Sequence, residues 1–211
     1  MTSADYARAR RILVRGDAVL AALIKQHGKC GLAEAQRSDH FSALVRAITN
    51  QQLSTKAAAT IYGRLTQHYG GRTPTPQEIL DTSPQELRAL GLSNAKAAYL
   101  RDLAEHIVDG ELPVDDLAEL PDAQVNEILT AVKGLGRWTV DMFLMFHLGR
   151  PDVLPVGDLG IRKAIQVHYG LQDLPSPSQM EQIAEAWRPH RTLACLYLWE
   201  SLDNRPGAGK P

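Results

Sequence analysis

Two glycines one residue apart, Gly134 and Gly136, lie between two segments whose apolar residues follow helical spacing. Because glycine has no Cβ atom, the backbone N–H groups of such a turn can approach a phosphate closely, and the N-terminal end of the following helix adds positive charge. A turn of this kind is also an ordinary short connection between helices, where glycine is favoured in any case. The spacing alone therefore leaves two interpretations open: a phosphate-binding hairpin and a plain turn.

Asp158 is the second candidate for chemistry, in the run Gly157-Asp158-Leu159-Gly160. It stands where a helix N-cap is expected, so capping is one interpretation of its side chain. Arg162 and Lys163 follow at the end of that helix where the helix dipole disfavours cations, and local rules are broken most readily at functional sites. Residues 131–165 also contain five basic and three acidic residues, an excess of +2 beside the glycine pair. Helix capping and a functional carboxylate both remain open at this point.

The elements that must position these residues are helices. Apolar residues recur at spacings of three and four along nearly the whole chain, as in Val125, Ile128 and Leu129, whereas alternating runs rich in β-branched and aromatic residues are nearly absent. Turn-forming residues divide the chain into predicted helices at residues 4–27, 39–51, 54–69, 76–81, 84–90, 93–109, 121–133, 136–148, 159–169, 178–187 and 190–202. We predict an all-α fold with a helix-hairpin-helix motif at about 121–148, whose turn contains the glycine pair.

Composition excludes several classes of protein. The chain has 211 residues, and its 23 Lys plus Arg against 24 Asp plus Glu give a net charge of −1, so any contact with nucleic acid must come from a local patch. Cys30 and Cys195 are too few for a four-cysteine zinc or iron–sulfur site, and the seven histidines show no zinc-binding spacing. No apolar run is long enough to cross a membrane and the N-terminus does not resemble a signal peptide, so we expect a cytoplasmic protein without membrane contact.

Several runs of the sequence share the pattern of one known family. They are Gln51-Gln52-Leu53-Ser54, Leu90-Gly91-Leu92-Ser93, Gly134-Leu135-Gly136-Arg137-Trp138-Thr139, Leu148-Gly149-Arg150-Pro151-Asp152, Gly157-Asp158-Leu159-Gly160, Trp187-Arg188-Pro189 and Tyr197-Leu198-Trp199. Together they resemble the helix-hairpin-helix Gly/Pro-Asp superfamily of DNA glycosylases, most closely the 3-methyladenine DNA glycosylase II family, whose members excise alkylated purines. The likeness extends over roughly residues 40 to 202, which makes it more specific than a match to one motif.

This resemblance implies a function and an architecture. The implied function is that of a monofunctional DNA glycosylase of base excision repair, which flips N-alkylated purines of the 3-methyladenine and 7-methylguanine type out of DNA, hydrolyses the N-glycosidic bond and leaves an abasic site. The implied architecture has two helical subdomains with a central cleft: residues 38–150, ending in the helix-hairpin-helix, and residues 1–37 with 151–211. Asp158, in the second subdomain, occupies the position of the catalytic acid. No cofactor is needed for catalysis, because a positively charged alkylpurine is already a good leaving group.

By resemblance, the pocket for the flipped base contains Trp138, Met142 and Trp199. Aromatic faces suit a cationic purine through stacking and cation–π attraction, but a large aromatic residue on a helix is usually buried in the core, and both interpretations stay open for the two tryptophans. Met142 stands where a relative has a tyrosine, which implies a softer pocket. Gln52 lies where the family places a wedge that replaces the flipped base; the alternative is that Gln51 and Gln52 only cap a helix turn.

The resemblance also implies contacts with the DNA backbone. They are Lys133, Gly134, Leu135, Gly136 and Thr139, and a structural monovalent cation is implied at the backbone carbonyls of Thr130, Lys133 and Leu135. The expected partner is double-stranded DNA with alkylated bases, bound by a monomer that associates with the nucleoid in a bacterial-type cytoplasm. Because Trp138 stands where bifunctional relatives have a nucleophilic lysine, strand cleavage through a Schiff base is not expected.

Two rival functions remain. In the first, the chain is a non-catalytic helix-hairpin-helix module that grips the DNA backbone, and Asp158 is only a helix cap, so that Asp158→Asn leaves function intact. In the second, the chain is a glycosylase for oxidised or mismatched bases. The tryptophan at position 138 and the shortage of cysteines for an iron–sulfur cluster disfavour this second rival.

Overall fold

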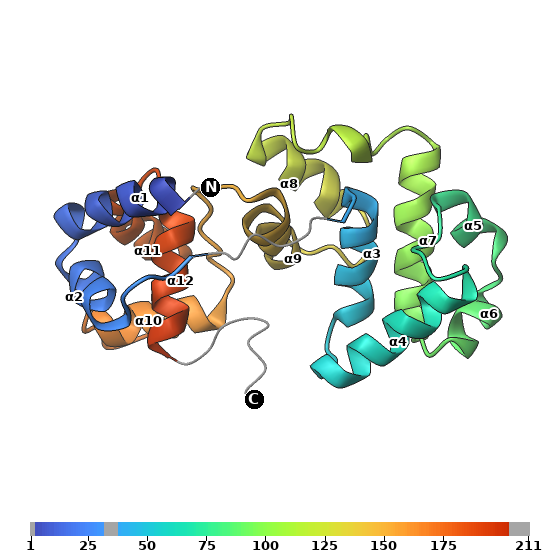
Figure 1. Ribbon diagram of the computed structural model, residues 1–211, viewed down its shortest axis with the longest axis horizontal. Coiled ribbons are helices and arrows are strands. Elements are labelled where there is room, and N and C mark those ends of the chain that lie inside the picture. Colours follow the sequence, from blue (N-terminus) through green and yellow to red (C-terminus); the bar gives the residue numbers. More distant parts are fainter. Residues whose placement is uncertain (1–2, 32–37, 203–211) are drawn as a thin grey trace. The chain divides into compact units, whose positions relative to one another are not determined.

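The computed structural model describes residues 3–31 and 38–202. Every regular element in these residues is helical (Figure 1), which confirms the predicted all-α fold. The α-helices are α1 (Ser3–Gly16), α2 (Ala18–His27), α3 (His40–Asn50), α4 (Thr55–His68), α5 (Pro76–Asp81), α6 (Pro84–Ala89), α7 (Asn94–Val108), α8 (Asp122–Ala131), α9 (Arg137–Met142), α10 (Leu159–His168), α11 (Pro177–Ala184) and α12 (Arg191–Ser201). Two 3₁₀-helices, η1 (Val114–Asp116) and η3 (Glu185–Trp187), and a π-helix, η2 (Phe143–Leu148), complete the set.

Local sequence signals explain where several of these helices begin. Thr75, Ser83 and Ser176 are the N-caps of α5, α6 and α11, and each forms a reciprocal capping box with the Glu or Gln three residues later. Each of these helices also has proline in its first turn, where the missing N–H costs nothing. These starts are therefore encoded by a few neighbouring residues.

The helix predicted over residues 4–27 is wrong, because the helix breaks at Asp17. The backbone of Asp17 is extended (φ −151°, ψ 119°), and its Oδ1 accepts a hydrogen bond of 2.9 Å from the Leu20 N–H, which begins α2. Its Oδ2 accepts hydrogen bonds from the Tyr169 hydroxyl (2.6 Å) and the Trp187 indole N–H (2.9 Å). Helical periodicity carries no information about such distant partners.

The second predicted helix of the motif, over residues 136–148, changes its winding. It starts as α9 and continues as the π-helix η2 from Phe143 to Leu148. A π-helical turn is rare and is found disproportionately at functional sites. The motif itself, α8 and α9 joined by residues 132–136, lies in the region predicted for it.

The chain divides into two compact units. The hairpin unit comprises residues 37–143, and the terminal unit comprises residues 1–36 and 144–211, as far as these residues are described. The sequence placed the divisions at 37–38 and 150–151. The first predicted division lies beside residues 32–37, which are outside the described residues. The second predicted division lies after η2, whereas the structure divides between residues 143 and 144, near the start of η2.

Each unit is built around one helix. In the hairpin unit, α7 packs on α3, α5 and α6 and buries Leu100 and Leu103. In the terminal unit, α12 packs on α1, α2 and α10, and every residue from Thr192 to Trp199 is buried. Because α12 is buried at every position of this stretch, it is a rigid base for neighbouring loops. None of the described helices is both long and apolar enough to span a bilayer.

Candidate functional site

The two glycines of the hairpin are required for different reasons. Gly134 has a left-handed backbone (φ 85°), and a Cβ atom there would collide with the ring of Tyr99. Gly136 has an ordinary φ of −75°, and a Cβ atom there would meet no described atom within 4 Å. Packing therefore explains the first glycine, whereas the second leaves open space at the start of α9.

The start of α9 has the features of an anion site. Gly136 is its N-cap residue and supplies no side-chain hydrogen bond, so the first N–H groups of the helix have no capping side chain. Thr139, half-buried, lies in the first turn, and no acidic residue lies there. This end of the helix carries the positive pole of the helix dipole, which attracts an anion such as phosphate.

Two long-range contacts hold the hairpin in shape. The buried carboxylate of Asp102, on α7, accepts hydrogen bonds from the Lys133 backbone N–H (2.8 Å) and from the Lys133 Nζ (2.6 Å). The Gln51 side-chain amide, at the end of α3, donates a hydrogen bond of 2.8 Å to the Gly134 carbonyl. Burial opposes the charge on Asp102, but the hydrogen bonds and the charge of Lys133 outweigh it and lower the pKa of this carboxyl. The hairpin is therefore preformed.

These contacts change the expectation for some of the predicted DNA-contacting residues. The ammonium and the backbone N–H of Lys133 both bind Asp102, so this lysine has a partner inside the protein. Leu135 is buried, and its N–H donates to the Val132 carbonyl (3.1 Å). Gly136 and Thr139 are the residues placed at the open end of α9.

The residues that could hold a metal ion are backbone groups of the same hairpin. The carbonyl oxygens of Thr130, Lys133 and Leu135 accept no backbone hydrogen bond from any residue that the structure describes. Carbonyl oxygens are ligands for hard cations, so the three atoms fit the chemistry of a cation site. Over the same described residues, no group of three His, Cys, Asp or Glu side chains gathers in a way that suits a metal ion.

Asp158 is both a helix cap and a partner of Trp199. Its Oδ1 accepts hydrogen bonds from the Ile161 backbone N–H (2.8 Å) and from the Trp199 indole N–H (2.9 Å), and the residue is only 7% exposed. A Cβ atom at position 160 would lie 3.1 Å from Asp158 Oδ1 and 3.2 Å from Trp199 Nε1, so Gly160 leaves the room that this contact needs. Helix capping, one of the two interpretations of this residue, is present in the structure, but it explains the hydrogen bond from Ile161 and not the one from Trp199.

The two tryptophans of the predicted base pocket differ in exposure. The ring of Trp199 is 1% exposed and stacks on Phe146, with 5.9 Å between ring centroids. The structure thus favours the core-packing alternative for Trp199 and gives its indole N–H the task of holding Asp158. Trp138, on α9, is 44% exposed, which argues against core packing for that residue. Met142 is half-buried one turn further along α9.

Gln52 has a strained backbone in the loop between α3 and α4. It is the one non-glycine residue with a positive φ (56°) within residues 3–31 and 38–202, and it is exposed. Such strain is most often kept at functional sites. Gln51, the C-cap residue of α3, binds the hairpin instead, so the two glutamines have different roles.

The predicted site residues fall into both units. Trp138, Met142 and Gln52 belong to the hairpin unit, whereas Asp158 and Trp199 belong to the terminal unit. The sequence did not predict that Asp102 supports the hairpin through Lys133. Nor did it predict that the missing Cβ atom of Gly160 leaves room for the contact between Asp158 and Trp199. A buried aspartate on a helix gives no signal in a hydrophobic pattern, because its partner, Lys133, is distant in sequence.

Comparison with known proteins agrees with the resemblance carried by the sequence runs. A model of the HhH-GPD superfamily of base excision DNA repair proteins matches residues 45–189. DNA-3-methyladenine glycosylase 1 of Schizosaccharomyces pombe is 38% identical over 168 residues, which are 79% of this chain and 74% of that protein. The solved structure of S. pombe 3-methyladenine DNA glycosylase with abasic DNA has a TM-score of 0.80 at 34% identity, covering 93% of this chain and 97% of that one. The crystal structure of a DNA-3-methyladenine glycosidase from Bacillus halodurans has a TM-score of 0.80 at 39% identity, and the match covers 90% of this chain and 86% of that one.

Proposed function

The chain belongs to the HhH-GPD superfamily of base excision DNA repair proteins, and from this premise we propose that it is a monofunctional DNA glycosylase for N-alkylated purines. It flips bases of the 3-methyladenine and 7-methylguanine type out of duplex DNA and hydrolyses the N-glycosidic bond, leaving an abasic site. The observation that supports this most is the buried carboxylate of Asp158, which accepts a hydrogen bond from the Trp199 indole N–H at a place where Gly160 has no Cβ atom to obstruct the contact.

One carboxylate is sufficient for this reaction. Alkylation at N3 or N7 leaves the purine positively charged, so the base departs readily and the sugar develops oxocarbenium character. A fixed aspartate stabilises that positive charge and orients or deprotonates the attacking water. The Trp199 indole N–H and the Ile161 backbone N–H hold Asp158 in place before the substrate arrives, so no reorganisation is needed during the reaction.

The flipped base needs an aromatic surface and a replacement in the duplex. We assign the surface to the exposed ring of Trp138, whose electron-rich face attracts a cationic purine, with Met142 as its neighbour one turn away. We assign the replacement to Gln52, since its left-handed backbone and exposed side chain suit a wedge that fills the gap in the base stack.

The hairpin grips the DNA backbone. The N–H groups at the start of α9, where the N-cap residue Gly136 has no side chain, are the phosphate contacts in this proposal together with Thr139, and Gly134 and Leu135 shape the turn. Lys133 supports the hairpin through Asp102. A monovalent cation at the carbonyls of Thr130, Lys133 and Leu135 would add positive charge beside the phosphate. We further propose a monomer that works on nucleoid DNA in the cytoplasm.

The test is the release of free bases from methylated duplex DNA, measured by chromatography. We expect 3-methyladenine and 7-methylguanine in the supernatant and intact strands until alkali cleaves the abasic sites. Duplexes with 8-oxoguanine or a mismatch serve as the comparison. Release from these alone would favour the rival glycosylase, and binding without release from any duplex would favour a non-catalytic module.

A further inference from the structure

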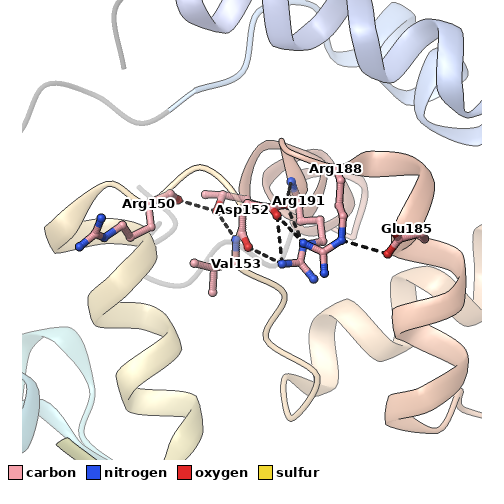
Figure 2. Close-up of polar contacts among 7 residues, drawn as sticks. Arg150, Asp152, Val153, Glu185, Arg188 and Arg191 are labelled. Atoms are coloured by element: carbon pink, nitrogen blue, oxygen red, sulfur yellow. Dashed lines mark hydrogen bonds and ion pairs between the residues drawn. The ribbon is translucent and has the colours of Figure 1, made fainter. Parts of the chain in front are cut away.

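A dense polar network lies upstream of Asp158, in the terminal unit (Figure 2). The carboxylate of Asp152 accepts hydrogen bonds from Arg191 Nε (2.8 Å), Arg191 Nη2 (3.1 Å) and Arg188 Nη1 (2.8 Å). Arg191 Nη2 also donates to the Asp152 backbone carbonyl at 2.6 Å. A guanidinium that binds both the side chain and the backbone of one residue fixes the position of that residue closely.

Thr192, the next residue of α12, binds the same segment of chain. Its hydroxyl donates to the Arg150 carbonyl (2.7 Å) and accepts a hydrogen bond from the Val153 N–H (3.1 Å), and its own N–H donates to the Pro151 carbonyl (3.0 Å). Thr192 is 4% exposed, so water cannot replace these bonds if they are lost. We call residues 150–153, with Arg188, Arg191 and Thr192, the clasp.

The clasp and Asp158 are attached to one helix. Thr192 lies in the first turn of α12 and Trp199 lies two turns later, ~10 Å along the axis at 1.5 Å per residue. The first residue holds the segment at 150–153, and the second holds Asp158 through the indole N–H. Because α12 is buried over this whole stretch, it acts as a rigid template for the chain that leads to the carboxylate.

We propose that Asp152 and Thr192 are positioning residues for Asp158. Neither touches the carboxylate; they set the register between the loop and α12, so that Asp158 meets the Trp199 indole N–H. The inference rests on the proposed function, in which Asp158 is catalytic. Displacement of a reacting group by about 1 Å costs on the order of 100-fold in rate, so a loosened clasp lowers the chemical step while DNA binding by the hairpin persists.

A residue beside the clasp, Glu185, provides a matched control. Glu185 accepts a hydrogen bond of 2.9 Å from Arg188 Nε, but its side chain is 71% exposed, and among the described contacts none joins it directly to residues 150–153. Glu185→Gln therefore removes a carboxylate of the same cluster without opening the clasp. The test variants are Asp152→Asn and Thr192→Val, each close in shape to the original, with Thr192→Ser as the conservative replacement that keeps the hydroxyl.

Three measurements are made on each full-length variant. They are the single-turnover rate of base release at saturating enzyme, the affinity for a duplex with an abasic site, and the position of the Trp199 indole N–H signal in a ¹H–¹⁵N spectrum of the free protein. We expect Asp152→Asn and Thr192→Val to lower the rate by at least about tenfold, to change the affinity by less than about threefold and to shift the Trp199 signal. Thr192→Ser should recover most of the loss, and Glu185→Gln should match the wild type in all three.

The outcomes separate this inference from the proposed function. The indole signals of Trp138 and Trp187 report whether the variants remain folded, and Thr192→Val carries the test if Asp152→Asn does not fold. Unchanged rate and unchanged Trp199 signal in a folded Asp152→Asn or Thr192→Val variant would overturn the clasp. If the wild type releases no base, the proposed function fails, and the Trp199 signal alone decides whether the clasp positions Asp158.

Discussion

At the scale of single residues, the account depends on how Asp158 is held. One oxygen of this carboxylate receives both a helix-cap hydrogen bond and the Trp199 indole N–H. The arrangement is compact: a Cβ atom at position 160 would lie 3.1 Å from Asp158 Oδ1 and 3.2 Å from Trp199 Nε1, so these neighbours would have to shift by a few tenths of an ångström to admit it. The sequence shows Asp158 and Gly160 two residues apart, but it does not show that both lie against Trp199, which belongs to α12.

Gly160→Ala tests this geometry. Because the new methyl group would lie 3.1 Å from Asp158 Oδ1, we expect the aspartate and Trp199 to move apart. The single-turnover rate of base release should fall by about tenfold, equal to ~1.4 kcal/mol in the barrier. Gly157→Ala is the matched control, since a Cβ atom there meets no described atom within 4 Å. Equal rates for the two variants would contradict the proposed packing of the carboxylate.

Lys133 provides a second test at this scale. Its ammonium binds Asp102, so we expect Lys133→Met to leave the salt dependence of DNA affinity nearly unchanged, while the melting temperature falls. Loss of a direct phosphate contact would instead lower the slope of log affinity against log salt by about 0.9. Binding titrations of undamaged duplex at several salt concentrations distinguish the two. A slope reduced by about 0.9 in the Lys133→Met variant would show that Lys133 contacts a DNA phosphate.

At the scale of elements, neighbouring residues predict where several helices begin, whereas contacts between residues distant in sequence explain where other helices break. The capping boxes with proline make α5, α6 and α11 predictable from a few residues. The break at Asp17 is not predictable in this way, because Tyr169 and Trp187 hold its carboxylate from far along the chain. The same holds for the hairpin: its glycines are visible in the sequence, but the contacts of Asp102 and Gln51 are tertiary.

The second helix of the motif contains a buried acid, Asp141, that makes stability depend on pH. Burial raises the pKa of its carboxyl above the ordinary 3.8, against the lowering effect of Arg137, whose Nε lies 3.0 Å away. The folded protein thus binds this proton more tightly than the unfolded chain, and the contribution of Asp141 to stability falls as pH rises from about 4 through the raised pKa.

Asp141→Asn should remove the loss of stability that the ionisation of Asp141 causes as pH rises. We expect the melting temperature of the variant, relative to the wild type, to increase as pH is raised from about 4 to 7. Thermal unfolding monitored by circular dichroism across this range measures the difference. Asp116→Asn, at an exposed carboxylate, is the control. A difference in melting temperature that stays constant with pH, or that shrinks as pH rises, would refute the argument.

At the scale of the whole molecule, the family match covers residues of both units, and the net charge of −1 leaves DNA binding to local features. The sequence runs identified the superfamily and pointed to the candidate acid, because each run is a short pattern of neighbouring residues. They did not reveal that Trp199 is buried or that Lys133 has an internal partner. Those facts depend on how helices pack.

The whole protein should also lack lyase activity. A Schiff base requires a free amine at the sugar, and position 138, where the resemblance implies a lysine in bifunctional enzymes, carries an indole. We expect no covalent enzyme–DNA product after borohydride reduction on methylated duplex, with a bifunctional glycosylase as the positive control. A trapped adduct that disappears on substitution of one lysine would show a bifunctional enzyme.

The most direct test of the central claim is base release by Asp158→Asn. Asparagine is as good a helix cap as aspartate and keeps an oxygen for the Trp199 indole N–H, so the fold and the binding of abasic duplex should be retained while the negative charge is lost. We predict that single-turnover release of methylated bases falls by about 100-fold or more, with affinity changed by less than about threefold. Release within about twofold of the wild type would contradict the account and leave Asp158 as a helix cap alone.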